Sequence, residues 1–596
     1  MPQSIAITGQ GIICAIGANC ESVLTSLLKG EKGISHMQYL GSAHKDIPVG
    51  EVKMSDNEMK DILGIPNDKD VSRTSLLGAI ALSQALTESG ITLDKLVGKR
   101  VALISGTTVG GMDVTERHYS KMLTERGEAQ YVVQHDCGSN TKEIAQLCGI
   151  NAELITISTA CSSALNAIIL GTRLLLADKV DIVLAGGSEA LSRFHLNGFN
   201  SLMILDRNDC RPFDSKRQGL NLGEGAAYVV LQRTADLSSE DLKKPLGYIA
   251  GYGNRCDAFH LTATSENGEG AYLAMSDALS MSGIVPPKID YINAHGTGTP
   301  DNDRSESQAI LRLFGTSYPP ISSTKSFTGH TTSASGSIET VISLLAIRNN
   351  FIPANLRWMN HAEECIVPSD GKLNVKLQYV LCNSFGFGGN DSTLILSAEP
   401  VALNEIKDSD DVVVSPVQEI INDENLSDIK KYVSPMESRR MSKIMKAAIL
   451  TSMQALESVG ANKPDAIIIG TAYGMLDQGE KILNHIESEG EEGLSPTLFM
   501  QSTHNTIAGT LAARFKCHGY NITYSQGEDS WNLALADAKQ LIAEGKAQNV
   551  LVGLHDYCPE HFRAIFELAG LDSPKKLISR SAIVSKRNLR KEASHA

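Results

Sequence analysis

Short apolar runs alternate with helix-like segments along most of the chain. The runs are bounded by glycine and include "SIAITGQG", "RVALISGTT", "ITIST", "DIVLAGGSEA" and "IDYINAHG". Segments such as "SLLGAIALSQALTESG" separate them and carry apolar residues at helical spacing. This alternation predicts an α/β architecture. The segment after residue 162 is apolar almost all round, with Leu165, Ile168, Ile169 and Leu175, and predicts a helix buried between layers.

The pattern lapses between about residues 398 and 436. The stretch "ALNEIKDSDDVVVSPVQEIINDENLSDIKKYVSP" is acidic and irregular, so residues 399–435 are expected to form a linker. The chain ends in "SPKKLISRSAIVSKRNLRKEASHA", which is basic and polar. This composition predicts a mobile tail over residues 559–596.

Residues 436–558 repeat blocks of the first half in the same order. "SNTKEIAQLCG" parallels "HNTIAGTLAARFKCHG", and "ITISTACSSALNAIILG" parallels "ITYSQGEDSWNLALADA". "VDIVLAGGSEAL" likewise parallels "AQNVLVGLHDYC". We interpret this as a partial internal duplication. In the second copy Glu528 stands where the first has Cys161. His504 and Cys517 of that copy are interpreted as structural residues.

Length and charge narrow the class of protein. A chain of 596 residues is too long for a single core, so two or more domains are expected. The formal charge of −14 argues against nonspecific nucleic-acid binding, which needs a basic surface. We expect no signal peptide and no membrane span. The 11 cysteines include no CxxC pair, so we expect a cytoplasmic protein without a disulfide framework or a zinc site.

Four segments carry candidate chemistry. Cys161 lies at a predicted strand-to-helix corner, where unpaired N–H groups and the helix dipole favour a thiolate. His295 follows an apolar run in "NAHGTGTPDNDRSE", and Lys325 precedes His330 by five residues in "STKSFTGH". Phe387 lies in the glycine-rich turn "NSFGFGGND". Each alone is more simply read as structural, but together they suit thioester chemistry.

Residues 1–398 resemble a β-ketoacyl-ACP synthase of the Cys-His-His type, from the thiolase-like superfamily. The resemblance rests on "IAITGQG", "TACSS", "CRPFDSKRQGLNLGEGAA", "NAHGTGTPDND", "KSFTGH" and "NSFGFGGN", which occur in the family's order. It implies a layered αβαβα fold made of two halves, about 1–245 and 246–398. The partial copy then adds an extra C-terminal half-copy.

The resemblance also implies roles for individual residues. Cys161 would accept the acyl group, while His295 and His330 would promote decarboxylation of malonyl-ACP and stabilise the enolate. Lys325 would orient His330. Two supporting residues complete the set. Glu306, eleven residues after His295, stands where the family keeps a supporting glutamate, and Phe387 would be a gate over the acyl pocket whose N–H forms an oxyanion hole with that of Cys161.

The reaction implied is decarboxylative Claisen condensation to 3-oxoacyl-ACP, in fatty-acid or polyketide synthesis, with an aryl-polyene or flexirubin-type pigment as one product. Relatives typically read "GHTLGAAGAVE" where this chain has "GHTTSASGSIE", so acyl preference cannot be inherited from them. No cofactor or metal is expected beyond the phosphopantetheine of the acyl carrier protein. A housekeeping fatty-acid elongation enzyme and a noncatalytic scaffold that needs a partner remain the alternatives.

The second copy resembles a truncated chain-length factor, a ketosynthase-like subunit that lacks the cysteine. Half of such a fold would expose apolar surface, so it is expected to dock on its own chain, a neighbouring chain or a further ketosynthase-like subunit. The expected assembly is a homodimer, or a pseudo-dimer that uses the duplicated segment.

Overall fold

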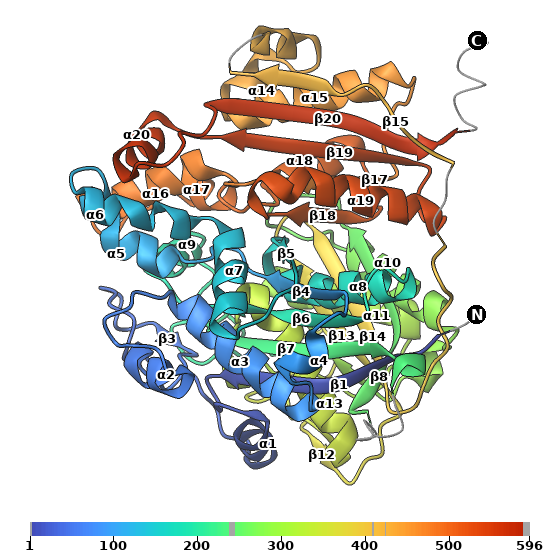
Figure 1. The fold of residues 1–596 in the computed structure, drawn as a ribbon. Coiled ribbons are helices and arrows are strands. Elements are labelled where there is room, and N and C mark those ends of the chain that lie inside the picture. Colours follow the sequence, from blue (N-terminus) through green and yellow to red (C-terminus); the bar gives the residue numbers. More distant parts are fainter. Residues whose placement is uncertain (1–2, 238–244, 408–410, 423–424, 588–596) are drawn as a thin grey trace.

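The computed structural model describes residues 3–237, 245–407, 411–422 and 425–587. Sixteen strands form one continuous hydrogen-bonded sheet, in the order β10-β9-β13-β14-β8-β1-β7-β6-β4-β5-β18-β17-β19-β20-β15, with β16 paired to β20. We call residues 3–407 the first module and residues 411–587 the second module. Figure 1 shows the second module, in orange and red, stacked on the first. The α/β architecture is as predicted.

The first module contributes two groups of strands to the sheet. The group from its N-terminal half is β1 (Ile5–Cys14), β4 (Val101–Gly106), β5 (Glu153–Ile157), β6 (Ile182–Glu189) and β7 (Gly225–Arg233). The group from its C-terminal half is β8 (Gly247–Cys256), β9 (Tyr291–Asn293), β10 (Ile321–Ser322), β13 (Tyr379–Gly386) and β14 (Asn390–Ser397). Antiparallel pairing of β1 with β8 joins the two groups. Two short ladders stand apart: β2 (Ser35–His36) with β3 (Pro48–Val49), and β11 (Phe351–Ile352) with β12 (Lys372–Leu373).

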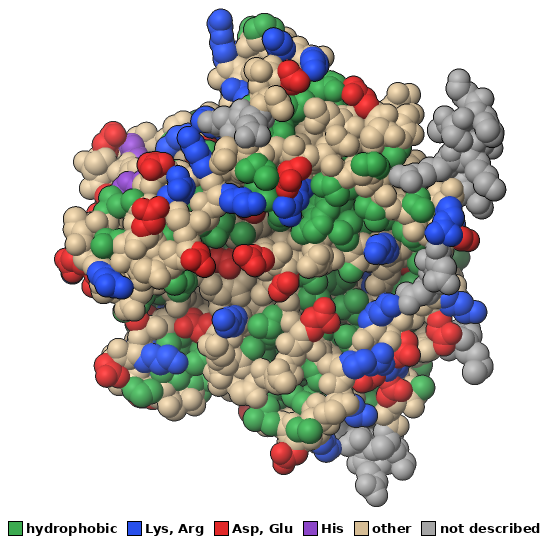
Figure 2. All heavy atoms as spheres, turned by 45° about the horizontal axis from the view of Figure 1, so that its top comes forward, with side chains coloured by type: hydrophobic (Ala, Val, Ile, Leu, Met, Phe, Trp, Pro, Cys, Tyr) green, Lys and Arg blue, Asp and Glu red, His purple; other side chains and the backbone are tan. Residues whose placement is uncertain are grey.

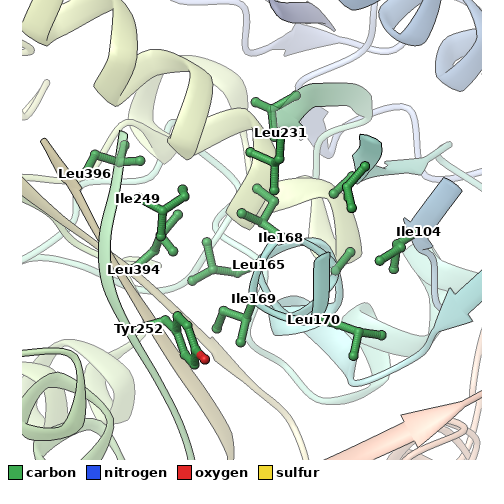
Figure 3. Close-up of a cluster of buried hydrophobic side chains, with 14 of the residues drawn as sticks. Ile104, Leu165, Ile168, Ile169, Leu170, Leu231, Ile249, Tyr252, Leu394 and Leu396 are labelled. Atoms are coloured by element: carbon green, nitrogen blue, oxygen red, sulfur yellow. The ribbon is translucent and has the colours of Figure 1, made fainter. Parts of the chain in front are cut away.

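Two helices fill the space between these groups of strands. Helices α8 (Ser163–Leu176) and α13 (Ser335–Asn349) each contact strands of both halves as well as each other. Figure 3 shows Leu165, Ile168 and Ile169 of α8 among Leu231, Ile249 and Leu394 of the surrounding strands. The prediction of a helix buried between layers is confirmed, because a helix that is apolar all round must be covered on every side.

The remaining helices of the first module cover the outer faces or form its edges, except α12 (Lys325–Thr328), whose residues are all buried. They are α1 (Cys20–Lys29), α2 (Asp56–Leu63), α3 (Arg73–Ser89), α4 (Leu93–Leu96), α5 (Met112–Met122), α6 (Arg126–Ala129), α7 (Cys137–Leu147), α9 (Arg193–Ser201), α10 (Glu269–Ser282), α11 (Pro300–Phe314) and α12 (Lys325–Thr328). Helix α3 packs on β1 and β7, and α10 packs on β8 and β14. Outer helices on both sides complete a five-layer arrangement.

The second module repeats the N-terminal half of the first. Its strands are β15 (Val412–Val414), β16 (Gln418–Ile421), β17 (Ala466–Gly470), β18 (Asn521–Tyr524), β19 (Asn549–Tyr557) and β20 (Leu577–Lys586). Its helices are α14 (Pro435–Arg439), α15 (Lys443–Ser458), α16 (Leu476–Ser488), α17 (Pro496–Met500), α18 (Thr506–Phe515), α19 (Ser530–Ala543) and α20 (Glu560–Ala569). Strand β17 runs parallel to β18 and β19, as β4 runs parallel to β5 and β6.

Two predicted boundaries are wrong. The expected linker 399–435 contains β15 and β16, which pair with β20, and a 3-10 turn at Leu426–Lys431. The expected tail 559–596 contains α20 and β20, so the described chain is ordered to Arg587. Strand β20 pairs antiparallel with β19 as β7 pairs with β6, which makes it part of the duplication. Its sequence "LISRSAIVSK" gives little indication of a strand, because serine and basic residues dilute its apolar positions.

The two modules meet along the edges of β5 and β18. These strands run antiparallel, with Tyr524 opposite Ile157. The N–H of Ser158 donates to the carbonyl of Thr523, and the N–H of Ser525 donates to the carbonyl of Thr156, each at 2.9 Å. From the sequence, the half-copy is expected to dock on its own chain, on a neighbouring chain or on a further subunit. The structure shows that it docks on the first module of its own chain.

Charges of both signs are mixed on the surface. Figure 2 shows Lys and Arg interspersed with Asp and Glu on the face that it presents. Among the described residues, no helix combines the length and the apolar character that crossing a bilayer requires.

A buried ion pair also links the modules. Arg173 on α8 is 1% exposed; its Nη1 lies 2.5 Å from Asp537 and its Nε lies 2.7 Å from Glu544, both on or next to α19. Removing one partner of a buried pair leaves the other charges without compensation. We therefore expect Arg173→Met to lower the free energy of unfolding by about 3–5 kcal/mol.

Denaturant titration followed by tryptophan fluorescence measures this change, because Trp531 lies on α19. The matched control is Lys431→Met, which removes an exposed ion pair with Asp428 and should leave the midpoint unchanged. An Arg173→Met midpoint equal to wild type would show that the pair does not hold the modules together.

Candidate active site

The nucleophile candidate lies at a tight corner between β5 and α8. A 3-10 turn, Ala160–Ser162, joins the two elements. Ala160 has a φ of 54°, a left-handed conformation that is strained for a residue with a side chain. Ser163 holds the corner, since its hydroxyl accepts from the Thr159 N–H at 2.9 Å and donates to the Ala160 carbonyl at 2.6 Å. The turn places Cys161 at the start of the helix, 6% exposed.

The two predicted histidines converge on this cysteine. His330 Nε2 lies 3.1 Å from Cys161 Sγ, and the rings of His295 and His330 lie 5.3 Å apart at 81°. Potential ligand atoms of the three residues all lie within 4.8 Å of one another. One thiol and two imidazoles can serve nucleophilic catalysis or bind a transition metal ion.

Each histidine is positioned by hydrogen bonds with a residue of a different helix. Ser335, at the start of α13, places its hydroxyl 3.0 Å from His330 Nδ1. Glu306 on α11 accepts hydrogen bonds from the backbone N–H groups of His295 at 2.9 Å and Gly296 at 2.8 Å. Asn383 on β13 donates to the same carboxylate at 3.1 Å. Glu306 therefore lies beside His295 and holds it through hydrogen bonds to the backbone.

Lys325 is buried close enough to both histidines for its charge to affect them. Its ammonium group pairs with the Glu339 carboxylate of α13, and the two residues are 1% and 2% exposed. The hydrogen-bond partner of His330 Nδ1 is the Ser335 hydroxyl. The sequence did not assign this role to Ser335, although it belongs to the "TTSASGS" stretch that departs from typical relatives. The predicted role of Lys325 in orienting His330 stays a prediction.

Burial and the lysine charge decide the protonation of the site. Burial, followed by the charge of Lys325, lowers the pKa of both His295 and His330 well below 6.5. Both rings are therefore neutral at physiological pH, with one N–H available to donate.

The thiol behaves differently from the expectation. The helix terminus suggested a stabilised thiolate, but burial raises the pKa of Cys161 to about 12. The charge of Lys325 and hydrogen bonds from the backbone N–H groups of Phe387 and Cys161 oppose this effect without overcoming it. Attack by the sulfur therefore requires a proton acceptor, and His330 Nε2 is in contact with it.

The glycine-rich turn faces the cysteine and is held by the second module. The carbonyl of Phe387 accepts a hydrogen bond from Asn505 Nδ2 at 2.7 Å. The next residue, Gly388, has a φ of +84°, and a Cβ there would lie 2.7 Å from the same amide nitrogen. The backbone N–H of Phe387 thus points at Cys161, and its backbone C=O points at Asn505.

Asn505 is a functional candidate that the sequence did not reveal. It is 1% exposed and lies just before α18. Its counterpart in the first copy is Asn140, whose amide donates to Ser75 at 2.6 Å. The shared "NT" pair was visible in the sequence, but no local signal indicates that one copy contacts a loop more than one hundred residues away.

Two cavities meet at Cys161. The outer cavity, of about 390 Å³, is lined by both histidines and by Thr297 and Asn302. The inner cavity is much narrower, about 40 Å³, and extends to the second module. That module contributes Tyr473, Met475, Leu476, Gly479, Phe499, Ser502, Thr503 and His504 to its wall.

Phe387 separates the two cavities. It lines both of them and stacks on Phe199, with ring centroids 5.8 Å apart and an angle of 23°. A chain attached to Cys161 must displace these rings to occupy the inner cavity. This position is compatible with the predicted gate.

Three regions of the sequence match known families. Residues 3–236 match "Beta-ketoacyl synthase, N-terminal domain" and residues 246–358 match "Beta-ketoacyl synthase, C-terminal domain". Residues 416–573 match a further family with the first of these descriptions. The third match agrees with the structured extent of the second module rather than with the predicted 436–558.

Curated relatives cover the length of the first module. The chain is 34% identical over 420 residues to 3-oxoacyl-[acyl-carrier-protein] synthase 2 of Coxiella burnetii, a match that covers 66% of this chain and 98% of that protein. The protein of the same name from Vibrio cholerae is 31% identical over 412 residues, with the same coverage of both chains.

Solved structures extend the likeness to both modules. The ketosynthase ApeO in complex with its chain length factor ApeC, from Xenorhabdus doucetiae, is 32% identical with a TM-score of 0.57, and the match covers 67% of this chain and 98% of that chain. The PfaC keto synthase–chain length factor gives a TM-score of 0.79 over 98% of this chain and 78% of that chain, at 18% identity. The latter likeness concerns the fold alone, and it confirms the thiolase-like layers with an extra half-copy.

The contact between Asn505 and Phe387 yields a prediction. We expect Asn505→Ala to slow acylation of Cys161 by an acyl thioester by about tenfold. Complete loss of one oxyanion donor costs roughly 10²–10³ in rate, and here the N–H of Phe387 remains but is no longer held towards the reacting centre. Intact-protein mass spectrometry measures the acylation rate.

Asn140→Ala is the matched control, since it removes the equivalent buried amide from the first copy. It should change the thermal midpoint without changing the acylation rate of the folded protein. Acylation of Asn505→Ala at the wild-type rate would show that the Phe387 peptide is positioned without the second module.

Proposed function

The chain belongs to the β-ketoacyl synthase family, and from this premise we propose how its residues divide the catalytic work. It condenses an acyl thioester with malonyl-ACP to give 3-oxoacyl-ACP and carbon dioxide, in fatty-acid or polyketide synthesis. The observation that carries this assignment is the 3.1 Å contact between Cys161 Sγ and His330 Nε2, inside a buried cluster that includes His295.

Acyl transfer to Cys161 is the first step. The sulfur attacks the thioester carbonyl while its proton passes to His330 Nε2. The N–H groups of Phe387 and Cys161 stabilise the oxyanion, which is supported by their hydrogen bonds to the sulfur. Collapse of the intermediate breaks the bond to the carrier, whose thiolate takes the proton from His330.

Condensation follows on the acylated enzyme. The malonyl carboxylate leaves as carbon dioxide, and its electron pair remains as an enolate that accepts a hydrogen bond from neutral His295. Neutral His330 donates as well once exchange with solvent has moved its ring proton to Nε2, a tautomer in which Nδ1 accepts from the Ser335 hydroxyl. The enolate carbon attacks the Cys161 thioester, the carbon–sulfur bond breaks, and a proton from solvent restores the thiol. The Lys325–Glu339 pair keeps a positive charge behind the two rings, which disfavours their protonation.

The second module is noncatalytic and shapes the acyl site. Glu528 is exposed at the corner that corresponds to Cys161, and the module has no counterpart of the segments that carry His295 and His330. Its residues instead line the inner cavity next to the catalytic cysteine. This placement supports a role like that of a chain-length factor.

We extend the proposal to partners. Substrates arrive on the phosphopantetheine arm of an acyl carrier protein through the outer cavity, in the cytoplasm. The module pair acts as a pseudo-dimer, which is supported by the reciprocal hydrogen bonds between β5 and β18. An aryl-polyene or flexirubin-type product stays a prediction of the sequence.

Mass spectrometry of the intact protein tests the assignment. Wild type incubated with acyl-ACP should gain the mass of the acyl group and lose it, as 3-oxoacyl-ACP, when malonyl-ACP is added. Cys161→Ala should gain none. The double variant Cys161→Ala with Glu528→Cys should also yield no 3-oxoacyl-ACP, because a thiol at the second corner has no histidine partners. Folded wild type that forms no adduct with any acyl-ACP would favour a noncatalytic scaffold.

The protonation of the histidines gives a pH test. Because burial and Lys325 lower the pKa of both rings well below 6.5, they stay neutral as the pH falls through the usual range of histidine. We therefore expect the acylated enzyme to decarboxylate malonyl-ACP at a constant rate between about pH 7.5 and about pH 5.5. A loss of activity with a midpoint near the ordinary histidine pKa would contradict this, provided that circular dichroism shows an intact fold.

A further inference from the structure

The inner cavity is mainly apolar, but three of its polar side chains have an unused hydrogen-bonding atom. These atoms are His135 Nδ1, Thr332 Oγ1 and His504 Nδ1, none of which has a hydrogen-bond partner within the described residues. The side chains are 9%, 4% and 7% exposed. A buried polar atom without a partner destabilises the protein, so we expect a ligand to supply the missing hydrogen-bond partners.

The three side chains come from different parts of the fold and meet around one space. His135 ends the 3-10 turn Gln130–His135 of the first module, and Thr332 follows the catalytic His330 by two residues. His504 belongs to the second module and lies next to Asn505. Aromatic rings complete the wall, including Phe199, Phe387, Tyr473 and Phe499.

The surroundings of His504 bear on which of its two ring nitrogens carries the proton. Its Nε2 lies 3.6 Å from Cys137 Sγ, and burial raises the pKa of that thiol well above the usual value. We assign the protonated thiol as the donor to Nε2, which places the ring proton on Nδ1, at the wall of the cavity. Burial lowers the pKa of His135 and His504 to about 4, so both rings are neutral and suit an uncharged acceptor.

We propose that the acyl group bound in this cavity carries a keto or hydroxyl oxygen beyond its thioester carbonyl, which accepts a hydrogen bond from His504 and reaches His135 or Thr332. This inference rests on the proposed function, because it assumes that the acyl chain on Cys161 enters the inner cavity. A wholly hydrocarbon chain would bury the same nitrogens and hydroxyl without partners. A site built to bond a substrate oxygen discriminates strongly against the analogue that lacks it.

The test compares acyl thioesters of equal length on the full chain. The probes are octanoyl-ACP, octanoyl-ACP analogues with one keto oxygen at successive carbons, and an analogue with a hydroxyl at the far end. Intact-protein mass spectrometry gives the rate of Cys161 acylation for each. We expect at least one oxygenated probe to react about tenfold faster than octanoyl-ACP, the ratio that one hydrogen bond of ordinary strength provides.

Variants at His504 locate the origin of that preference. His504→Leu should abolish it, so that octanoyl-ACP and the oxygenated probes react with this variant at equal rates. His504→Asn should retain it, because the side-chain amide presents an N–H close to the position of Nδ1. His555→Leu is the matched control: His555 is also a buried neutral histidine of the second module, with an unpaired Nε2, but it lies outside the cavity wall.

Each outcome decides the proposal. Equal or faster reaction of octanoyl-ACP than of every oxygenated probe overturns it, as does a preference that survives His504→Leu. Either result leaves Cys161 acylation, and with it the proposed function, intact. Failure of every probe to acylate folded wild type overturns the proposed function itself, and the inference falls with it.

Discussion

The antiparallel contact between β5 and β18 is the constraint on which the rest of the molecule depends. Each strand lies at the edge of its own module, and an exposed edge leaves backbone N–H and C=O groups unpaired. The reciprocal bonds of Ser158 with Thr523 and of Ser525 with Thr156 satisfy these groups and merge the strands into one sheet. Both corners that follow these strands, at Cys161 and Glu528, are thereby fixed relative to one another. The buried charges of Arg173, Asp537 and Glu544 reinforce the same seam.

This seam explains why one active site draws on two modules. The cysteine, both histidines and the Lys325–Glu339 pair all belong to the first module. The second module reaches the same centre from the other side, by the amide of Asn505 on the Phe387 carbonyl and by the wall of the inner cavity. A module without a nucleophile can therefore influence both the rate and the choice of acyl chain.

Residues that lie in local motifs could be predicted from the sequence, whereas residues that act across the seam could not. Cys161, His295 and His330 stand in short distinctive stretches, and the structure brings them together. Asn505 and Ser335 have ordinary neighbours, and their importance appears only when distant segments meet. Burial is likewise a tertiary property, which is why the helix terminus suggested a thiolate that the structure does not support. Strand β20 could not be predicted because its composition hides the apolar pattern. Two of its buried positions are serines, Ser579 and Ser581, whose hydroxyls hydrogen-bond the hydroxyl of Thr451.

The duplication also removes a restriction that symmetry imposes on two-fold assemblies. In a pair of identical chains, any residue placed at the interface appears on both sides of the axis and must suit both settings. Here Ser139 and His504 occupy matching positions of the two copies, as do Asn140 and Asn505, yet they face different surroundings. Each side of the seam can therefore change independently, and covalent linkage keeps the two sides in equal amounts at any protein concentration. Asymmetry of this kind allows one copy to keep the reaction constant while the other adapts to new acyl groups.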